Sequence, residues 1–195
     1  MPLGRPRTFD TDKALDKALK VFWRKGYEGS SLPDLTAAMG INRPSLYAAF
    51  GNKAALFKKA VERYSTGPGS FACQALAQPT ARAVVQHLLN GGIDMVTHPK
   101  NPHGCLMVQG ALACGDDADC MRQELSRHRE STVRQIRKRL QRAKEEGDLP
   151  HSSDPADLAR FISTVMHGIA VQAASGATRA QLKRVADLTL KTWPT

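Results

Sequence analysis

Apolar residues recur along most of this chain at the spacing of one face of an α-helix. In the first such segment Leu15, Ala18, Leu19, Phe22 and Trp23 follow the i, i+3, i+4, i+7, i+8 pattern. No run of alternating apolar and polar residues bounded by turn signals, the pattern of a strand, occurs in the sequence. The periodicity therefore predicts an all-α fold.

Capping residues define two short helices after this first one. Ser31, with Asp34 three residues later, matches a capping box that opens a helix, and Gly40 ends that helix. Asn42 then caps a third helix over residues 43–50. A sharp turn between two helices requires positive φ, which glycine adopts without steric cost. The segment is thus predicted to be a helix-turn-helix, the motif that places its second helix in the major groove of DNA.

The third helix has a buried and an exposed side. Leu46 and Phe50 are expected to face the core, so Arg43 and Tyr47 lie on the outer side, where Arg43 can donate two hydrogen bonds to a guanine. The helices capped by Ser31 and Asn52 offer N-terminal N–H groups to phosphate, and Lys53 adds a charge. The candidate DNA-binding residues are Ser31, Arg43, Pro44, Ser45, Tyr47, Asn52 and Lys53.

The charge of the chain supports a polyanionic partner. The 195 residues include 28 Lys and Arg against 18 Asp and Glu, a net charge of +10. Residues 1–64 hold 12 of these basic residues and only 6 of the acidic ones. Arg5 and Arg7 can form a basic arm that enters the minor groove, or simply a solvated tail. Double-stranded DNA is therefore the predicted partner, bound either at a specific site or by a sequence-independent architectural mode.

The N-terminal third resembles a known family of DNA-binding proteins. It is similar to the N-terminal domain of TetR/AcrR-family transcriptional regulators. The residues that carry the resemblance are Gly26-Tyr27, Ser31, Leu35, residues 40–47, Phe50-Gly51-Asn52-Lys53 and Leu56-Phe57. The chain departs from that pattern at Ala49, where the family often has an aromatic residue or His, and at Ala54, where it often has Glu.

The resemblance implies the overall organisation. It implies about nine helices, with a helix-turn-helix domain over residues 1–64 and an effector-binding and dimerisation domain over 65–195. It further implies a homodimeric repressor that binds a palindromic operator and is released by a small-molecule inducer. The last two long helices of such proteins form a four-helix bundle with their mates.

Two well-capped helices at the end of the chain fit that dimerisation role. Asp154 is a predicted N-cap with Pro155 at the first helical position, and Thr178 with Gln181 forms a second capping box. The apolar residues expected at the dimer interface are Leu158, Ile162, Ile169, Leu182, Val185 and Leu188.

An effector pocket is expected between the helices of the second domain. Leu88, Phe161, Val165 and Met166 are its predicted apolar lining, with His167 as a further candidate, although each also fits an ordinary core position. Gly91-Gly92 is expected to interrupt its helix, either as a kink or to make room for a ligand.

Cys105 supports an alternative function, a repressor that senses oxidants or electrophiles. It lies next to Gly104 at the start of a predicted helix, where the helix dipole is expected to lower the pKa of a thiol. The segment resembles the Gly-Cys-Leu region of the N-ethylmaleimide-reductase regulators of the same family. Cys114, nine residues later, is too distant along a helix for a disulfide without rearrangement. Both cysteines also fit small buried side chains.

Other functional classes lack support in the sequence. We find no nucleophile–base motif, phosphate loop or paired carboxylates for an enzyme, and no Cys or His spacing for a metal, so neither catalysis nor a cofactor is predicted. The mean hydropathy is −0.37, and residues 162–178 are too polar to span a bilayer. The N-terminus has no apolar core of a secretory signal. A cytoplasmic protein is expected.

Overall fold

The computed structural model describes residues 9–112 and 119–194, and within these ranges the chain forms ten α-helices and one 3-10 turn, with no strand. The all-α prediction is confirmed. The helices are α1 (Thr11–Lys25), α2 (Leu32–Met39), α3 (Arg43–Phe50), α4 (Lys53–Thr66), α5 (Phe71–Leu76), α6 (Ala81–Thr97), α7 (Leu106–Leu112), α8 (Asp119–Glu145), α9 (Pro155–Ala174) and α10 (Arg179–Lys191), with the 3-10 turn η1 over Pro68–Ser70.

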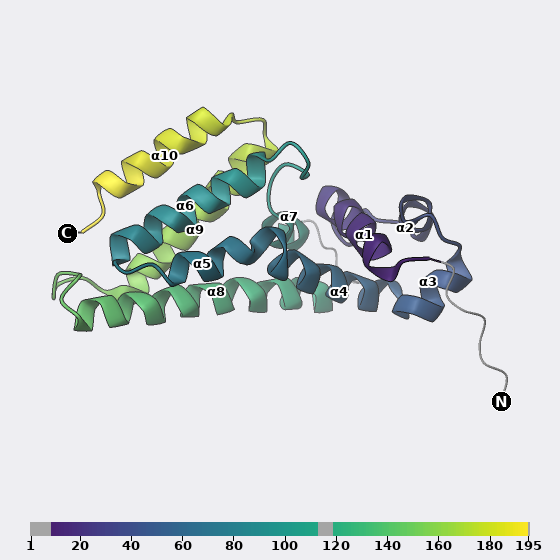
Figure 1. The fold of residues 1–195 in the computed structure, drawn as a ribbon, viewed down its shortest axis with the longest axis horizontal. Helices are drawn as coiled ribbons and strands as arrows, with labels where there is room; N and C mark the ends of the chain where they lie inside the picture. The colour runs from purple at the N-terminus through teal and green to yellow at the C-terminus, as the bar shows by residue number, and fades with distance from the viewer. Residues whose placement is uncertain (1–8, 113–118, 195) are drawn as a thin grey trace.

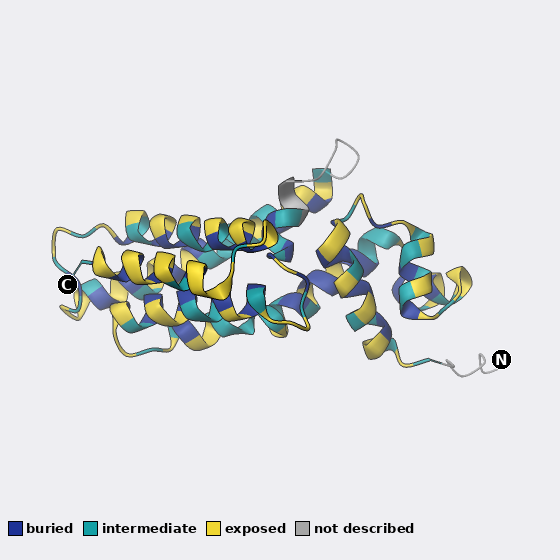
Figure 2. Ribbon diagram, turned by 90° about the horizontal axis from the view of Figure 1, so that it is seen from above, coloured by how far each residue is buried: buried dark blue, intermediate teal, exposed yellow. Residues whose placement is uncertain are grey.

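The helices form two groups joined by α4. Figure 1 shows α1, α2 and α3 at one end of an elongated molecule, and α5, α6, α8, α9 and α10 at the other. The expected domain division at residue 64 lies in the last turn of α4, which continues to Thr66 before η1 begins. In both groups the exposed residues cover the outer faces of the helices while the inner faces are buried (Figure 2).

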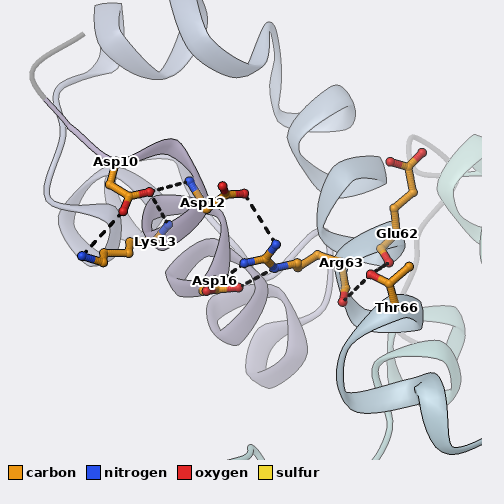
Figure 3. A network of polar contacts seen from close by, with 7 residues as sticks. All are labelled: Asp10, Asp12, Lys13, Asp16, Glu62, Arg63 and Thr66. Carbon is orange, nitrogen blue, oxygen red and sulfur yellow. Dashed lines mark hydrogen bonds and ion pairs between the residues drawn. The ribbon is translucent and has the colours of Figure 1, made fainter.

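The small group is held together by aromatic packing and one charged network. Phe22 of α1 meets Phe57 of α4 edge to face, with ring centroids 5.0 Å apart. Arg63 of α4 donates from Nε to Asp16 Oδ1 at 2.8 Å and from Nη2 to Asp16 Oδ2 at 3.2 Å, and it also pairs with Asp12 (Figure 3). The two-pronged contact aligns α1 with α4, the helix that leads into the large group.

The large group is a bundle around α6, α8 and α9. Ile136 and Leu140 of α8 and Ile162 of α9 are fully buried between them. Arg160 of α9 pairs with Glu130 of α8 at 2.9 Å on the surface of the same contact. The part of the chain that the structure describes has no helix long and apolar enough to cross a membrane.

Two local features differ from the sequence prediction. Residues 71–76 form α5, a helix that the sequence did not predict, and α6 runs without interruption through Gly91 and Gly92, where an interruption was expected. Phe71 explains both findings: a Cβ on Gly91 would lie 2.6 Å from Phe71 Cδ2 and 3.0 Å from its Cβ. Gly91 therefore lets α5 pack directly on α6, and it marks a close contact rather than a kink.

Candidate functional site

The helix-turn-helix forms as predicted. The Ser31 side chain accepts the N–H of Asp34 at 3.1 Å, and Asn42 accepts the N–H of Ser45 at 2.8 Å, so both short helices begin at their predicted caps. Gly40 ends α2 in the left-handed region with φ of 72°. Leu35, Leu46 and Phe50 are buried beneath the motif.

The outer face of α3 is exposed to solvent. Arg43, Pro44 and Ala48 are exposed, the Tyr47 side chain is 47 % exposed, and Ser45 is half-buried. Pro44 stands in the first turn, where its missing N–H removes no helical hydrogen bond. A short helix that presents Arg, Ser and Tyr outward can enter the major groove without rearranging the core.

The N-terminus of α4 has the features that favour an anion. Asn52 accepts the N–H of Ala55 at 2.8 Å, and the first turn contains no acidic residue. Lys53 Nζ lies 4.4 Å from the centroid of the Tyr27 ring, and partial burial lowers the pKa of this lysine. The Tyr27 ring thus contacts the ammonium group of the first residue of α4.

The N-terminus of α2 differs from this arrangement. The Asp34 carboxylate accepts hydrogen bonds from the N–H and hydroxyl of Ser31, and Lys25 pairs with it at 2.9 Å. These contacts, that of Lys25 first, lower the pKa of Asp34 to about 2. A carboxylate therefore stands where the sequence predicted an open N-terminus at Ser31, which makes this end of α2 less favourable to an anion than the start of α4.

A cavity of about 240 Å³ lies within the large group, bordered by α4 to α9. Leu88, Met166 and His167 line it as predicted. Phe161 and Val165 are not among its lining residues, which corrects that prediction: α9 turns Ser163, Met166 and His167 inward, and the Phe161 side chain on its other side is 44 % exposed.

Cys105 also lines this cavity, but its environment is opposite to the one predicted. It precedes α7 and is half-buried, and the Tyr64 hydroxyl lies 3.1 Å from its Sγ and 3.1 Å from Met95 Sδ. Burial raises the pKa of the Cys105 thiol, outweighing the Tyr64 and backbone hydrogen bonds that lower it. The predicted lowering of this pKa is wrong. Cys114 lies outside the described residues.

Two contacts connect the cavity wall to the helix-turn-helix group. The Trp23 indole of α1 donates from Nε1 to the carbonyl oxygen of Gly104 at 3.0 Å, directly before Cys105. The Trp23 and Tyr64 rings meet edge to face, 4.7 Å apart. The sequence did not reveal this buried hydrogen bond between α1 and the segment before α7, because its partners are 81 residues apart.

The six residues predicted for a dimer interface fall into two groups. Ile162, Ile169 and Leu182 are at most 4 % exposed within the single chain, so they form its own core and not a free surface. Leu158 is half-buried. Val185 and Leu188 of α10 are 43 % and 61 % exposed. Phe161 and Val171 of α9 are also exposed, although the sequence did not assign them to an interface.

Several polar residues of the cavity were also missed. Arg129 and Thr132 of α8 and Ser163 of α9 line it. Ser163 carried a usable signal, because it is a hydroxyl residue on the inner stripe of an apolar helix, beside Ile162. Arg129 carried none, because α8 bears many basic residues and only the packing distinguishes the one that faces inward.

Comparison with known proteins agrees with this architecture. Residues 14–60 match the sequence model of the bacterial regulatory proteins of the tetR family, and residues 81–188 match the tetracyclin repressor-like C-terminal domain. The HTH-type transcriptional repressor ComR of Escherichia coli is 32 % identical over 98 % of this chain and 92 % of its own length. The repressor BdcR of the same organism is 29 % identical over 92 % of this chain and 86 % of its own.

Solved structures show the same fold. A cysteine-substituted TetR-family regulator, CifR, bound to 26-base-pair operator DNA, is 41 % identical, covers 97 % of this chain and all of its own, and superposes with a TM-score of 0.93. Reduced NemR of E. coli, 17 % identical over 94 % of this chain and 96 % of its own, has a TM-score of 0.77 and shares the fold. The chain therefore belongs to the TetR family and is a DNA-binding, helix-turn-helix transcriptional repressor.

Proposed function

We propose that this repressor is a homodimer that reads a palindromic operator with its two α3 helices and is released when a small molecule fills the cavity. The observation that carries the proposal is the pair of contacts from Trp23 and Tyr64 to the Gly104–Cys105 segment, because they join the cavity wall to the DNA-binding group. An occupant that displaces this segment changes the position of α1, and thereby the spacing of the two α3 helices.

In the proposed DNA contact, Arg43 reads a base and the start of α4 holds the backbone. Arg43 is exposed, and its guanidinium matches the two acceptors on the major-groove edge of guanine. Asn52 and Lys53 provide a helix N-terminus and a positive charge for a phosphate. Half-sites one helical turn, about 34 Å, or a multiple of it apart are expected for such a dimer.

DNA recognition is tested by binding to the region upstream of the protein's own gene at fixed salt, with unrelated competitor DNA. A specific repressor is expected to favour its operator about 10³-fold or more, whereas an architectural protein would bind both alike.

Arg43→Ala is expected to weaken operator binding by about 5- to 150-fold and to relax the preference at particular base pairs. The control is Arg137→Ala, exposed on α8. Equal loss in both variants would contradict base reading by Arg43.

Dimerisation is proposed through α9 and α10, whose outer faces carry Phe161, Val171, Val185 and Leu188. Large apolar side chains exposed on two neighbouring helices are a feature that an interaction surface would explain. Leu188→Glu is expected to convert the dimer to a monomer in analytical ultracentrifugation, because it places a charge at the centre of the buried contact. Ser152→Glu, with the same charge change in an exposed loop, should remain dimeric. A dimer unaffected by Leu188→Glu would place the interface elsewhere.

A further inference from the structure

The cavity has two unlike walls. Leu88, Leu89 and Gly92 of α6 form an apolar wall, whereas α8 and α9 contribute the polar side chains of Arg129 and Ser163. No Asp or Glu is among the described residues that line it. A mostly apolar pocket with a few convergent polar groups is the usual form of a small-molecule site, and the polar groups determine which molecule is selected.

Ser163 is the first polar group without a partner. Its side chain is only 5 % exposed, and its Oγ has no hydrogen bond within the described part of the chain. A serine in mid-helix commonly bonds the carbonyl of the preceding turn, as Thr164 does with Arg160 at 2.9 Å, but Ser163 does not. Buried hydroxyls are nearly always paired, so this one indicates a bound partner in the cavity.

Arg129 is the second group, and no carboxylate of the described residues pairs with its positive charge. Its Nη1 donates to the carbonyl oxygen of Met107 at 2.7 Å. Its neighbour Glu130 is already paired with Arg160 at 2.9 Å. Burial lowers the pKa of His167, and the positive charge of Arg129 lowers it further. His167 therefore faces the cavity as a neutral ring that can form hydrogen bonds.

The volume limits the size of an occupant. An apolar cavity of about 150 Å³ holds benzene, so 240 Å³ corresponds to about ten non-hydrogen atoms. We propose that the effector is a small organic acid of about this size, with its apolar body against α6 and its carboxylate on Arg129 and Ser163. Arg and carboxylate form charge-assisted hydrogen bonds, which are stronger than those a neutral amide can make. This inference rests on the proposed role of the cavity as the effector site.

The test uses matched probes and calorimetry on the full chain without DNA. Benzoate and hexanoate are compared at pH 7.4 with benzamide, hexanamide and hexylamine, which keep the apolar body and change only the head group. We expect the two acids to bind about 10- to 100-fold more tightly than the amides, and the amine not to bind. Amides that bind as tightly as the acids, or acids that do not bind at all, would overturn the proposal.

Two variants locate the head group. Ser163→Ala removes a hydroxyl that has no partner in the folded chain, so it should leave the melting temperature unchanged or higher while weakening benzoate binding. Arg129→Gln should remove the difference between benzoate and benzamide, and Arg134→Gln, exposed on the same helix, should preserve it. A difference that persists in Arg129→Gln would refute the assignment. Operator binding measured without any probe reports separately on the DNA-binding function.

Discussion

The chemistry of Cys105 is determined by the side chains packed around it. Its Sγ lies 3.1 Å from the Tyr64 hydroxyl in a wall of apolar residues, and burial raises the pKa of both groups. A thiol in this environment stays protonated over a wider pH range than a free cysteine, which slows its reaction with oxidants. The folded state holds these two protons more tightly than the unfolded chain does, and this difference contributes to the free energy of unfolding. The contribution is fully present at pH values below the pKa values of the unfolded chain, and it is lost as the pH rises through the pKa values of the folded state.

The pH dependence of alkylation tests this environment. With iodoacetamide and peptide mass spectrometry, the midpoint of the rate–pH curve for Cys105 is expected at higher pH in the folded protein than in the same chain in urea. The unfolded chain is the matched control, because reagent and residue are identical and only the burial differs. A folded midpoint below the unfolded one would restore the helix dipole as the dominant influence and, with it, a thiolate sensor.

At the scale of elements, the contact between α5 and α6 depends on one glycine. Gly91 allows Phe71 to approach where any Cβ would overlap it, whereas a Cβ on Gly92 would find Phe71 Cζ at an ordinary 3.8 Å. Two adjacent glycines of the same helix therefore have different reasons to be there. The difference lies in the helix packed against them, and not in α6 itself.

Alanine substitutions at these two positions should have opposite effects on stability. Gly91→Ala is expected to destabilise the fold, because overpacking costs about 1–3 kcal/mol and exceeds the gain in helix propensity of about 1 kcal/mol. Gly92→Ala should raise the free energy of unfolding by roughly that propensity gain. Urea unfolding at one fixed protein concentration measures both. Equal effects of the two substitutions would show that the Phe71 contact does not constrain α6.

At the scale of the whole molecule, an indole hydrogen bond is one of the contacts between the two helix groups, beside the Trp23–Tyr64 ring contact. Trp23 Nε1 donates to the carbonyl of Gly104, while Trp193 Nε1, also in a buried side chain, has no hydrogen-bond partner among the described residues. The two tryptophans therefore form a natural pair for comparison, since replacement by Phe removes similar volume from each.

Trp23→Phe should cost more stability than Trp193→Phe. Both lose packing, but only the first leaves a buried carbonyl unpaired, which adds about 1–3 kcal/mol. Urea unfolding of the two variants measures the difference. In Trp23→Phe we also expect a weaker effect of any cavity ligand on operator affinity, because the contact between α1 and the segment before α7 is lost. Equal costs in the two variants would show that this bond does not hold the groups together.

The sequence by itself determined the helices and the DNA-reading motif. The caps at Ser31, Asn42, Asp154 and Thr178 formed where predicted because each is a bond between residues two or three positions apart. The left-handed turn at Gly40 is equally local. Such interactions depend only on neighbouring residues, and the spacing of apolar residues then selects the buried face of each helix.

The tertiary structure decided which apolar residues face the cavity, which form the single-chain core and which remain exposed. Phe161, Ile162 and Ser163 follow one another on α9, yet they lie on the surface, in the core and in the cavity wall. The pKa of Cys105 likewise depends on Tyr64, 41 residues away. The spacing of apolar residues identifies the apolar stripe of a helix but not the segment that packs against it. Segments distant in the sequence decide which side chains are buried, and burial in turn sets the free energy of a charge or of an unpaired hydroxyl.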